Sequence, residues 1–70
     1  MSRYKGHPIY GVAVPVTENR WYSRGLVFDR NLKQTTEIKR IESTAVTFKT
    51  RKQAEKYGLE LCKAWIDKQL

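Results

Sequence analysis

The residues best suited to chemistry lie at the start of a helix that the sequence predicts near its C-terminus. Thr50 takes the N-cap position, and Gln53, three residues later, completes a T-x-x-Q capping box. Three cations surround this cap: Lys49, Arg51 and Lys52. Acidic side chains are normally favoured at the positive end of the helix dipole, so these cations indicate a function. Together with the unpaired backbone N–H groups of the first turn, these cations predict a phosphate-binding site. The simpler alternative is that their side chains only extend into water.

Basic and aromatic residues are also interleaved in the segments predicted to be strands. If a helix covers one face of a small sheet, the other face stays open. Cations mixed with aromatic rings would suit phosphate contacts and base stacking on such a face. The residues available to line it are Arg20, Tyr22, Arg24, Lys33, Lys39 and Arg40. The alternative for Tyr22, and more so for Trp21, is that the ring completes a small core.

The sequence offers little support for catalysis or metal binding. It contains no acid pair with a reason for perturbed pKa values, no phosphate-binding glycine loop and no nucleophile motif. A structural zinc site needs four ligands, whereas the chain has one cysteine, Cys62, and one histidine, His7. Cys62 is predicted to be a buried, inert thiol and His7 a surface residue. We therefore expect a protein that is not an enzyme and that needs no cofactor or metal.

The helix that positions the cap is predicted over residues 51–69. Its core face, taken at 100° per residue, gathers Ala54, Tyr57, Gly58, Leu61 and Trp65. Gly58 on this face indicates close packing of the helix on the sheet, near Trp21. A second apolar ridge consists of Leu59, Ile66 and Leu70. Either the sheet covers this ridge or the ridge is a contact surface for another chain.

Three β-strands are predicted before the helix, over residues 8–16, 20–30 and 34–41. Residues 45–48 form either a short fourth strand or an extended lead into the helix, and residues 1–7 are expected to be a flexible end. Within the second strand, Gly25 is predicted to form a bulge that brings Trp21 and Phe28 to one face. The expected fold is a single α+β domain, an antiparallel meander of three or four strands with the helix packed on one face.

The charge balance favours an anionic partner. The 70-residue chain carries a net charge of +7. Residues 1–50 hold nine Lys/Arg and four Asp/Glu, which gives this part a net charge of +5. Residues 51–70 hold five Lys/Arg and three Asp/Glu, which gives a net charge of +2. Such a balance is typical of polyanion binding, although it also promotes solubility. Without a signal peptide or an apolar run of the roughly 20 residues that span a bilayer, we expect a soluble, cytoplasmic protein.

The strand–helix junction resembles a DNA-binding domain. The chain has Trp21 and Tyr22 in a predicted strand, followed by the pattern F-x-T-x-x-x-A-E from Phe48 to Glu55. This arrangement resembles the N-terminal arm-binding domain of phage-type integrases. In that family a three-stranded sheet enters the major groove of DNA and a C-terminal helix backs it. The resemblance covers about residues 20–60. This chain differs in its additional N-terminal strand and contains no recombinase domain.

A second resemblance spans nearly the whole chain. It rests on F-x-T-x-x-x-A-x-x-x-G from Phe48 to Gly58, on Trp65-Ile66-Asp67 and on the start Tyr4-Lys5-Gly6. These features resemble small stand-alone bacterial domains of uncharacterised function, in which a strand meander is followed by one helix. The resemblance implies the same fold and leaves the function open. The double-stranded-RNA-binding domain has a similar lysine-rich junction, but its first helix has no counterpart here.

The function that we expect from the sequence is nucleic-acid binding by a small basic domain. The expected site comprises the helix start and the open sheet face, with Lys49, Thr50, Arg51, Lys52, Arg20, Tyr22, Arg24, Lys39 and Arg40. The alternative is a protein-interaction or self-association module that uses the ridge of Leu59, Ile66 and Leu70. The choice between DNA and RNA stays open.

Overall fold

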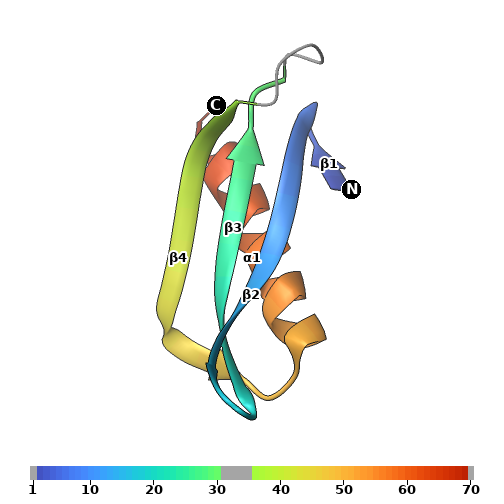
Figure 1. Ribbon diagram of the computed structural model, residues 1–70. Coiled ribbons are helices and arrows are strands. Elements are labelled where there is room, and N and C mark those ends of the chain that lie inside the picture. Colours follow the sequence, from blue (N-terminus) through green and yellow to red (C-terminus); the bar gives the residue numbers. More distant parts are fainter. Residues whose placement is uncertain (1, 31–35, 70) are drawn as a thin grey trace.

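The computed structural model, which describes residues 2–30 and 36–69, confirms the predicted α+β fold. Its elements are β1 (Ser2–Tyr4), β2 (His7–Thr17), β3 (Arg20–Phe28), β4 (Glu37–Phe48) and α1 (Arg51–Asp67). The four strands pair antiparallel in the order β1-β2-β3-β4, so each strand lies beside the next one in the chain. Helix α1 crosses one face of this sheet and leaves the other uncovered (Figure 1).

Three glycines let α1 approach the sheet very closely. Gly11 and Gly25 are cross-strand partners on β2 and β3, and Gly58 of α1 lies against them. A Cβ atom on Gly11 would lie 1.8 Å from the carbonyl oxygen of Glu55, and one on Gly58 would lie 2.4 Å from that of Arg24. Neither position has room for a side chain. The predicted close packing at Gly58 is therefore confirmed, and it is backbone against backbone.

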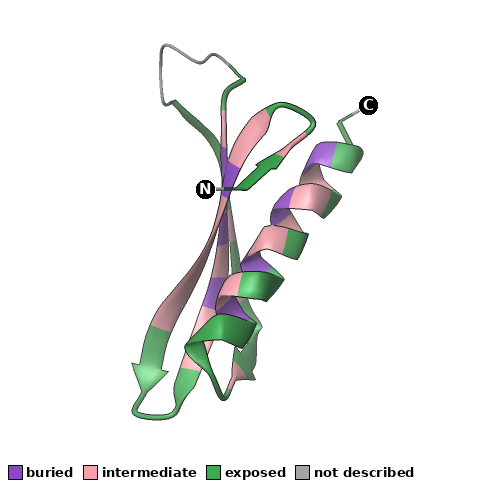
Figure 2. Ribbon diagram, turned by 90° about the vertical axis from the view of Figure 1, so that its right-hand side faces the viewer, coloured by how far each residue is buried: buried purple, intermediate pink, exposed green. Residues whose placement is uncertain are grey.

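The core is small and follows a narrow stripe of α1. Every fourth residue of the helix is buried, at Ala54, Gly58, Cys62 and Ile66 (Figure 2). Cys62 and Ile66 pack against Ile9 and Val27 of the sheet, and Ser23 Oγ, itself buried, donates a hydrogen bond of 2.7 Å to the carbonyl oxygen of Ala54.

The predicted core face of α1 was rotated away from the observed one. Tyr57 is 37% exposed, whereas Leu61 and Trp65 are half-buried on the flanks of the stripe. The hydrophobic pattern favours large side chains at the centre of the contact. The glycine pair of the sheet instead selects the smallest side chains of the helix, because only these allow the two backbones to meet.

The two described residues of the apolar ridge, Leu59 and Ile66, pack into or against the core, so the interface that we predicted on them is wrong. Ile66 is only 3% exposed and belongs to the core, and Leu59 packs against that core. Leu70, the third member, lies outside the described residues. Of the two alternatives for this ridge, the structure supports burial.

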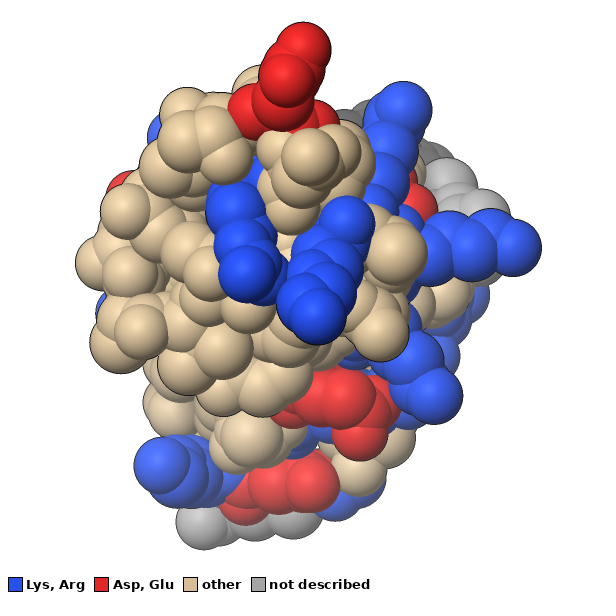
Figure 3. Space-filling view, turned by 90° about the horizontal axis from the view of Figure 1, so that it is seen from below, with Lys and Arg blue, Asp and Glu red and all other residues tan. Residues whose placement is uncertain are grey.

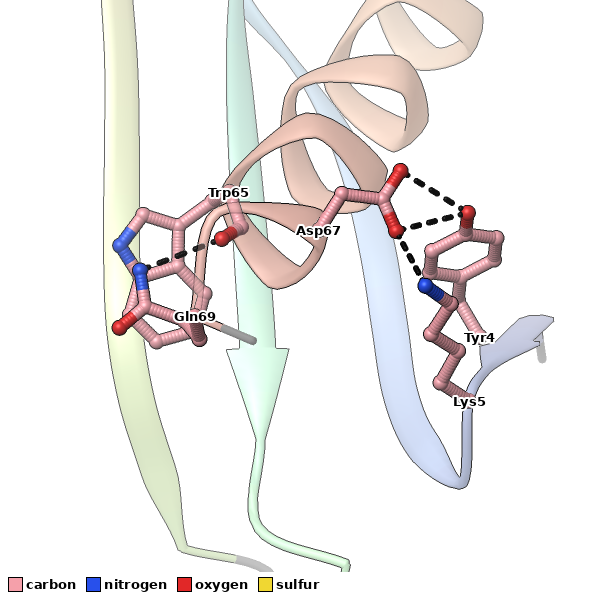
Figure 4. Close-up of polar contacts among 5 residues, drawn as sticks. All are labelled: Tyr4, Lys5, Trp65, Asp67 and Gln69. Atoms are coloured by element: carbon pink, nitrogen blue, oxygen red, sulfur yellow. Dashed lines mark hydrogen bonds and ion pairs between the residues drawn. The ribbon is translucent and has the colours of Figure 1, made fainter.

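The N-terminus is a strand, not the flexible end that was predicted. β1 pairs with β2 through a turn in which Lys5 and Gly6 have φ of 49° and 86°. Two-residue hairpin turns of this kind need positive φ at both positions, which glycine adopts without strain. The turn is also held to the end of α1. Tyr4 Oη and Lys5 Nζ both donate to the carboxylate of Asp67, at 3.0 and 2.7 Å (Figure 4).

The segments predicted over 34–41 and 45–48 belong to one bent strand, β4, although residues 34 and 35 lie outside the described part. Its register with β3 passes from Ser23–Ser43 directly to Trp21–Phe48. Residues 44–47 therefore lie opposite the single residue Tyr22, and the lower end of β4 bends (Figure 1).

The bulge that we predicted at Gly25 is absent from the described sheet. Gly25 pairs in register with both of its neighbours, Gly11 and Ile41. Because side chains alternate along a strand, Trp21 and Phe28 lie on opposite faces of the sheet.

Candidate nucleic-acid interface

The uncovered face of the sheet carries large apolar and aromatic side chains. Since Gly11 and Gly25 face α1, the even-numbered residues of β2 and β3 face away from it. We call this surface the open face, and its apolar members are Tyr10, Val12, Val14, Tyr22, Leu26 and Phe28. The rings of Tyr10 and Phe28 meet edge to face, with centroids 5.4 Å apart. All six side chains are only half-buried, because no other element covers them.

Two arginines complete the open face, each with an acidic partner. Arg24 lies between Val12 and Glu42 in the register, and its Nη2 is 2.7 Å from Glu42 Oε1. Its Nε is buried and finds no hydrogen-bond acceptor among the described residues. Arg40, the partner of Leu26, pairs with Glu37 at 3.2 Å. These carboxylates position both guanidinium groups on the face and offset much of their charge.

The tyrosine at the centre of the prediction, Tyr22, lies beside Arg24 on this face. A shallow depression of about 40 Å³ is lined by Val14, Tyr22, Ser23, Arg24, Glu42 and Thr44. Since Tyr22 faces away from α1, its ring is not part of the core under the helix, and it lines the same depression as Arg24.

Further cations gather where the β2–β3 hairpin and the start of α1 meet. Trp21 pairs with Phe48, and Arg20 and Lys49 each adjoin one member of this pair in the chain. We call this surface the basic end; it consists of Arg20, Lys49, Arg51 and Lys52. Figure 3 views the molecule from this side and shows several Lys and Arg side chains, with acidic side chains lying between and beside them.

The helix start has the predicted cap. Thr50 is extended, with φ −127° and ψ 150°, and its Oγ1 accepts a hydrogen bond of 3.1 Å from the backbone N–H of Gln53. The first turn contains no acid. Arg51 forms an ion pair of 3.2 Å with Glu55, whereas neither Lys49 nor Lys52 has an ion-pair partner among the described residues. The two lysines are thus the cations available to an anionic ligand.

The structure separates one predicted residue from the rest of the site. Lys39 pairs with Val27 and so shares the face that α1 covers. It lies on the edge strand, away from the open face, whereas its neighbour Arg40 belongs to that face. Lys33 lies outside the described residues.

Sequence reasoning missed the contribution of β2 and of Phe28 to the open face. The signal was present, because Tyr10, Val12 and Val14 alternate with Ile9, Gly11 and Ala13. Reading Gly11 as a mark of close backbone approach would have assigned the aromatic side of β2 to the open face.

The remaining candidates for chemistry have structural roles. Burial raises the pKa of the Cys62 thiol, and its Sγ lies 3.4 Å from the carbonyl oxygen of Leu26, in keeping with an inert thiol. His7 is half-buried, not a surface residue. Its Nδ1 donates to the carbonyl oxygen of Phe28 at 2.8 Å, and its Nε2 accepts from Arg30 Nε at 3.2 Å. Within the described ranges, no group of three or more His, Cys, Asp or Glu could hold a metal ion.

Comparisons with known proteins add no relative. No family model matches this chain, and no curated protein or solved structure matches it. The two resemblances noted in the sequence therefore stay predictions. Among the residues that the structure describes, no helix is long and apolar enough to cross a membrane.

Proposed function

We propose that this protein is a non-enzymatic module that binds single-stranded nucleic acid through its open face and its basic end. One observation carries the proposal: Tyr10, Tyr22 and Phe28 lie on the face that α1 leaves uncovered. A domain of this size normally needs its large rings in the core, and half-buried rings gathered on an uncovered face favour a binding surface.

Base stacking is the interaction that this face supports best. Each base stacked on an aromatic side chain contributes about 1–3 kcal/mol, and an arginine plane can serve in the same way. Arg24 and Arg40 suit stacking better than phosphate contact, because carboxylates already offset their charge. In a duplex the bases stack on each other, so the ligand that can use these rings is a single strand.

The basic end would then hold the backbone of the same strand. Arg20, Lys49 and Lys52 have no acidic partner among the described residues, and the N–H groups of the first turn of α1 point out of the same end. Both RNA and DNA offer phosphates and bases, and the cytoplasm, the compartment that we propose, contains both.

Self-association through the open face is the second candidate. It is favoured by the aliphatic side chains Val12, Val14 and Leu26 that lie between the rings. Two copies could stack these faces as the two layers of a sandwich. The cations of the basic end would then have no role in the contact.

Fluorescence anisotropy with labelled oligonucleotides tests the proposal. We expect single-stranded DNA and RNA to bind more tightly than a duplex of equal length. The logarithm of the binding constant should fall with the logarithm of salt concentration by about 0.7 for each phosphate contacted. Sedimentation of the protein alone provides the control. Absence of binding at low salt, together with a concentration-dependent dimer, would replace the proposal with the second candidate.

A further inference from the structure

A groove on the helix side of the sheet is not used by the function proposed above. It has a volume of about 340 Å³ and lies between the bent end of β4 and α1. Its lining consists of Phe48, Gln53, Lys56, Tyr57 and Glu60. The bend of β4 creates this groove, since residues 44–47 lie opposite Tyr22 alone and carry Phe48 to the helix.

The two aromatic rings of the groove form a surface pair. The rings of Phe48 and Tyr57 lie 5.1 Å apart, tilted by 42°. Tyr57 is 37% exposed, and neither residue belongs to the buried core cluster or packs against it. The fold therefore leaves a pair of tilted aromatic rings partly in contact with solvent.

The charges around these rings fit a nucleotide. Lys56 lines the groove, Lys49 directly follows Phe48, and Lys52 directly precedes Gln53. None of these lysines has an ion-pair partner among the described residues. The groove thus combines a stacking surface with one lining cation, Lys56, and with the amide of Gln53 and the carboxylate of Glu60 for the polar edge of a base. Lys63 pairs with Glu60 at 3.2 Å and offsets the charge of this carboxylate. An aliphatic side chain of a protein partner would use the rings alone.

The groove also adjoins the open face at one end of the sheet. Phe48 pairs with Trp21, the neighbour of Tyr22 in β3. Cross-strand partners are about 5 Å apart, so a strand that leaves Tyr22 crosses only the sheet end, past Lys49, to reach the groove.

We propose that this groove takes one unstacked base of the single strand that occupies the open face, with the adjoining phosphate held by the lysines. This inference rests on the proposed function for the source of the base. It adds a second stacking site, on the other side of the sheet, and predicts that the bound strand bends around the end of β3 and β4.

The test compares two substitutions at Tyr57, with an eight-nucleotide single strand of thymidine or uridine as the probe. Tyr57→Leu keeps an apolar side chain and removes the stack, and we expect it to weaken binding about fivefold or more. Tyr57→Phe keeps the ring and should bind like the parent. In aromatic NMR spectra of the parent, the ring signals of Phe48 and Tyr57 should shift on addition of the strand.

A second pair of variants covers the case in which Tyr57→Leu does not fold. Lys56→Gln should reduce the salt slope by about 0.7, as expected for one lost phosphate contact. Lys68→Gln, at the exposed far end of α1, is the matched control and should leave the slope unchanged.

The outcomes separate this inference from the proposed function. If the probe binds the parent and shifts Tyr22, but Tyr57→Leu and Lys56→Gln bind like the parent, the groove inference is wrong and the proposed function stands. If the probe does not bind the parent even at low salt, both fail.

Discussion

The two faces of β2 and β3 depart from the usual distribution of side chains in a two-layer domain at the centre of the sheet. The face under α1 carries Gly11, Gly25 and Ser23 among its central residues, whereas the face open to solvent carries Tyr10 and Tyr22. Sheets of this kind normally pack their large apolar residues on the covered side. Here the centre of the covered side is held by close backbone contact, with Ile9 and Val27 in the core beside it, and Tyr10, Tyr22 and Phe28 remain on the other side.

This contrast separates stability from binding within the same strands. A substitution on the covered face contacts the backbone of α1, so it should change the free energy of unfolding. A substitution on the open face contacts no other element of the fold, so it should change the affinity for the ligand. Substitutions at neighbouring residues of one strand should therefore differ in effect, one lowering stability and the next lowering affinity.

The largest effect is expected from a methyl group at the glycine contact. Gly11→Ala would place a Cβ at 1.8 Å from the backbone of α1, so the helix must move away. We expect a loss of about 3 kcal/mol of unfolding free energy, at the upper end for overpacking, measured by urea denaturation. Val14→Ala, on the open face of the same strand, should cost about 1 kcal/mol or less. Equal stability of Gly11→Ala and the parent would mean that α1 does not touch β2 there.

Removal of a ring from the open face should reduce binding with little effect on folding. Tyr22→Leu is expected to weaken the affinity for a single-stranded oligonucleotide by about 1–3 kcal/mol, because one stacking surface is lost. Its unfolding free energy should change by less than about 1 kcal/mol, since no element covers this side chain. Tyr22→Phe is the control for the ring itself. A large loss of stability without loss of affinity would assign Tyr22 to the core.

A charge reversal at the helix start should have opposite effects on binding and stability. Lys52→Glu removes an unpaired cation and places an acid at the positive end of the helix dipole. We expect weaker binding, a flatter salt dependence by about 0.7, and a gain in stability of about 0.3–1 kcal/mol. The double variant Arg51→Glu, Lys52→Glu also breaks the Arg51–Glu55 pair, so the single variant is the cleaner test. A gain in stability without any loss of binding would make Lys52 an ordinary surface residue.

The smallest effect is expected at the contact between the N-terminal turn and α1. The hydrogen bond from Lys5 lowers the pKa of Asp67 and raises the pKa of Lys5. Because the folded state holds Asp67 ionised more firmly than the unfolded state, this contribution is present at neutral pH and is lost as pH falls below about 4. The protection factors of the β1 amides, which compare the observed exchange rate with the intrinsic rate at the same pH, should therefore fall in acid, and Asp67→Asn should remove this fall. Both groups are exposed, so the change in global stability should be slight.

Local patterns predicted the elements of this fold well. The structure shows the predicted cap at Thr50, the helix that follows it and the strands before it. These elements could be predicted because each depends mainly on residues that are neighbours in the sequence. The turn at Lys5 and Gly6 was equally local and was missed, because its strand partner is only three residues long.

The faces were harder to predict because they depend on distant partners. Which side of α1 is buried follows from the pairing of Gly11 with Gly25, which no periodicity in residues 51–69 reveals. For the same reason the ridge that includes Ile66 was offered as an interface, and the true exposed surface on β2 was overlooked. The contact between Phe48 and Tyr57 depends on the bulge at residues 44–47 of β4. This bulge contains no glycine or proline that would mark it in the sequence.

The measurement that tests the central claim most directly is an aromatic NMR titration of the rings on the open face. Single-stranded oligonucleotide is added at low salt while the ring signals of Tyr10, Tyr22 and Phe28 are followed. If bases stack on this face, these signals should move upfield together and saturate, and a duplex of the same sequence should move them far less. Ring signals that stay unchanged with the single strand, or that move with protein concentration alone, would contradict the claim.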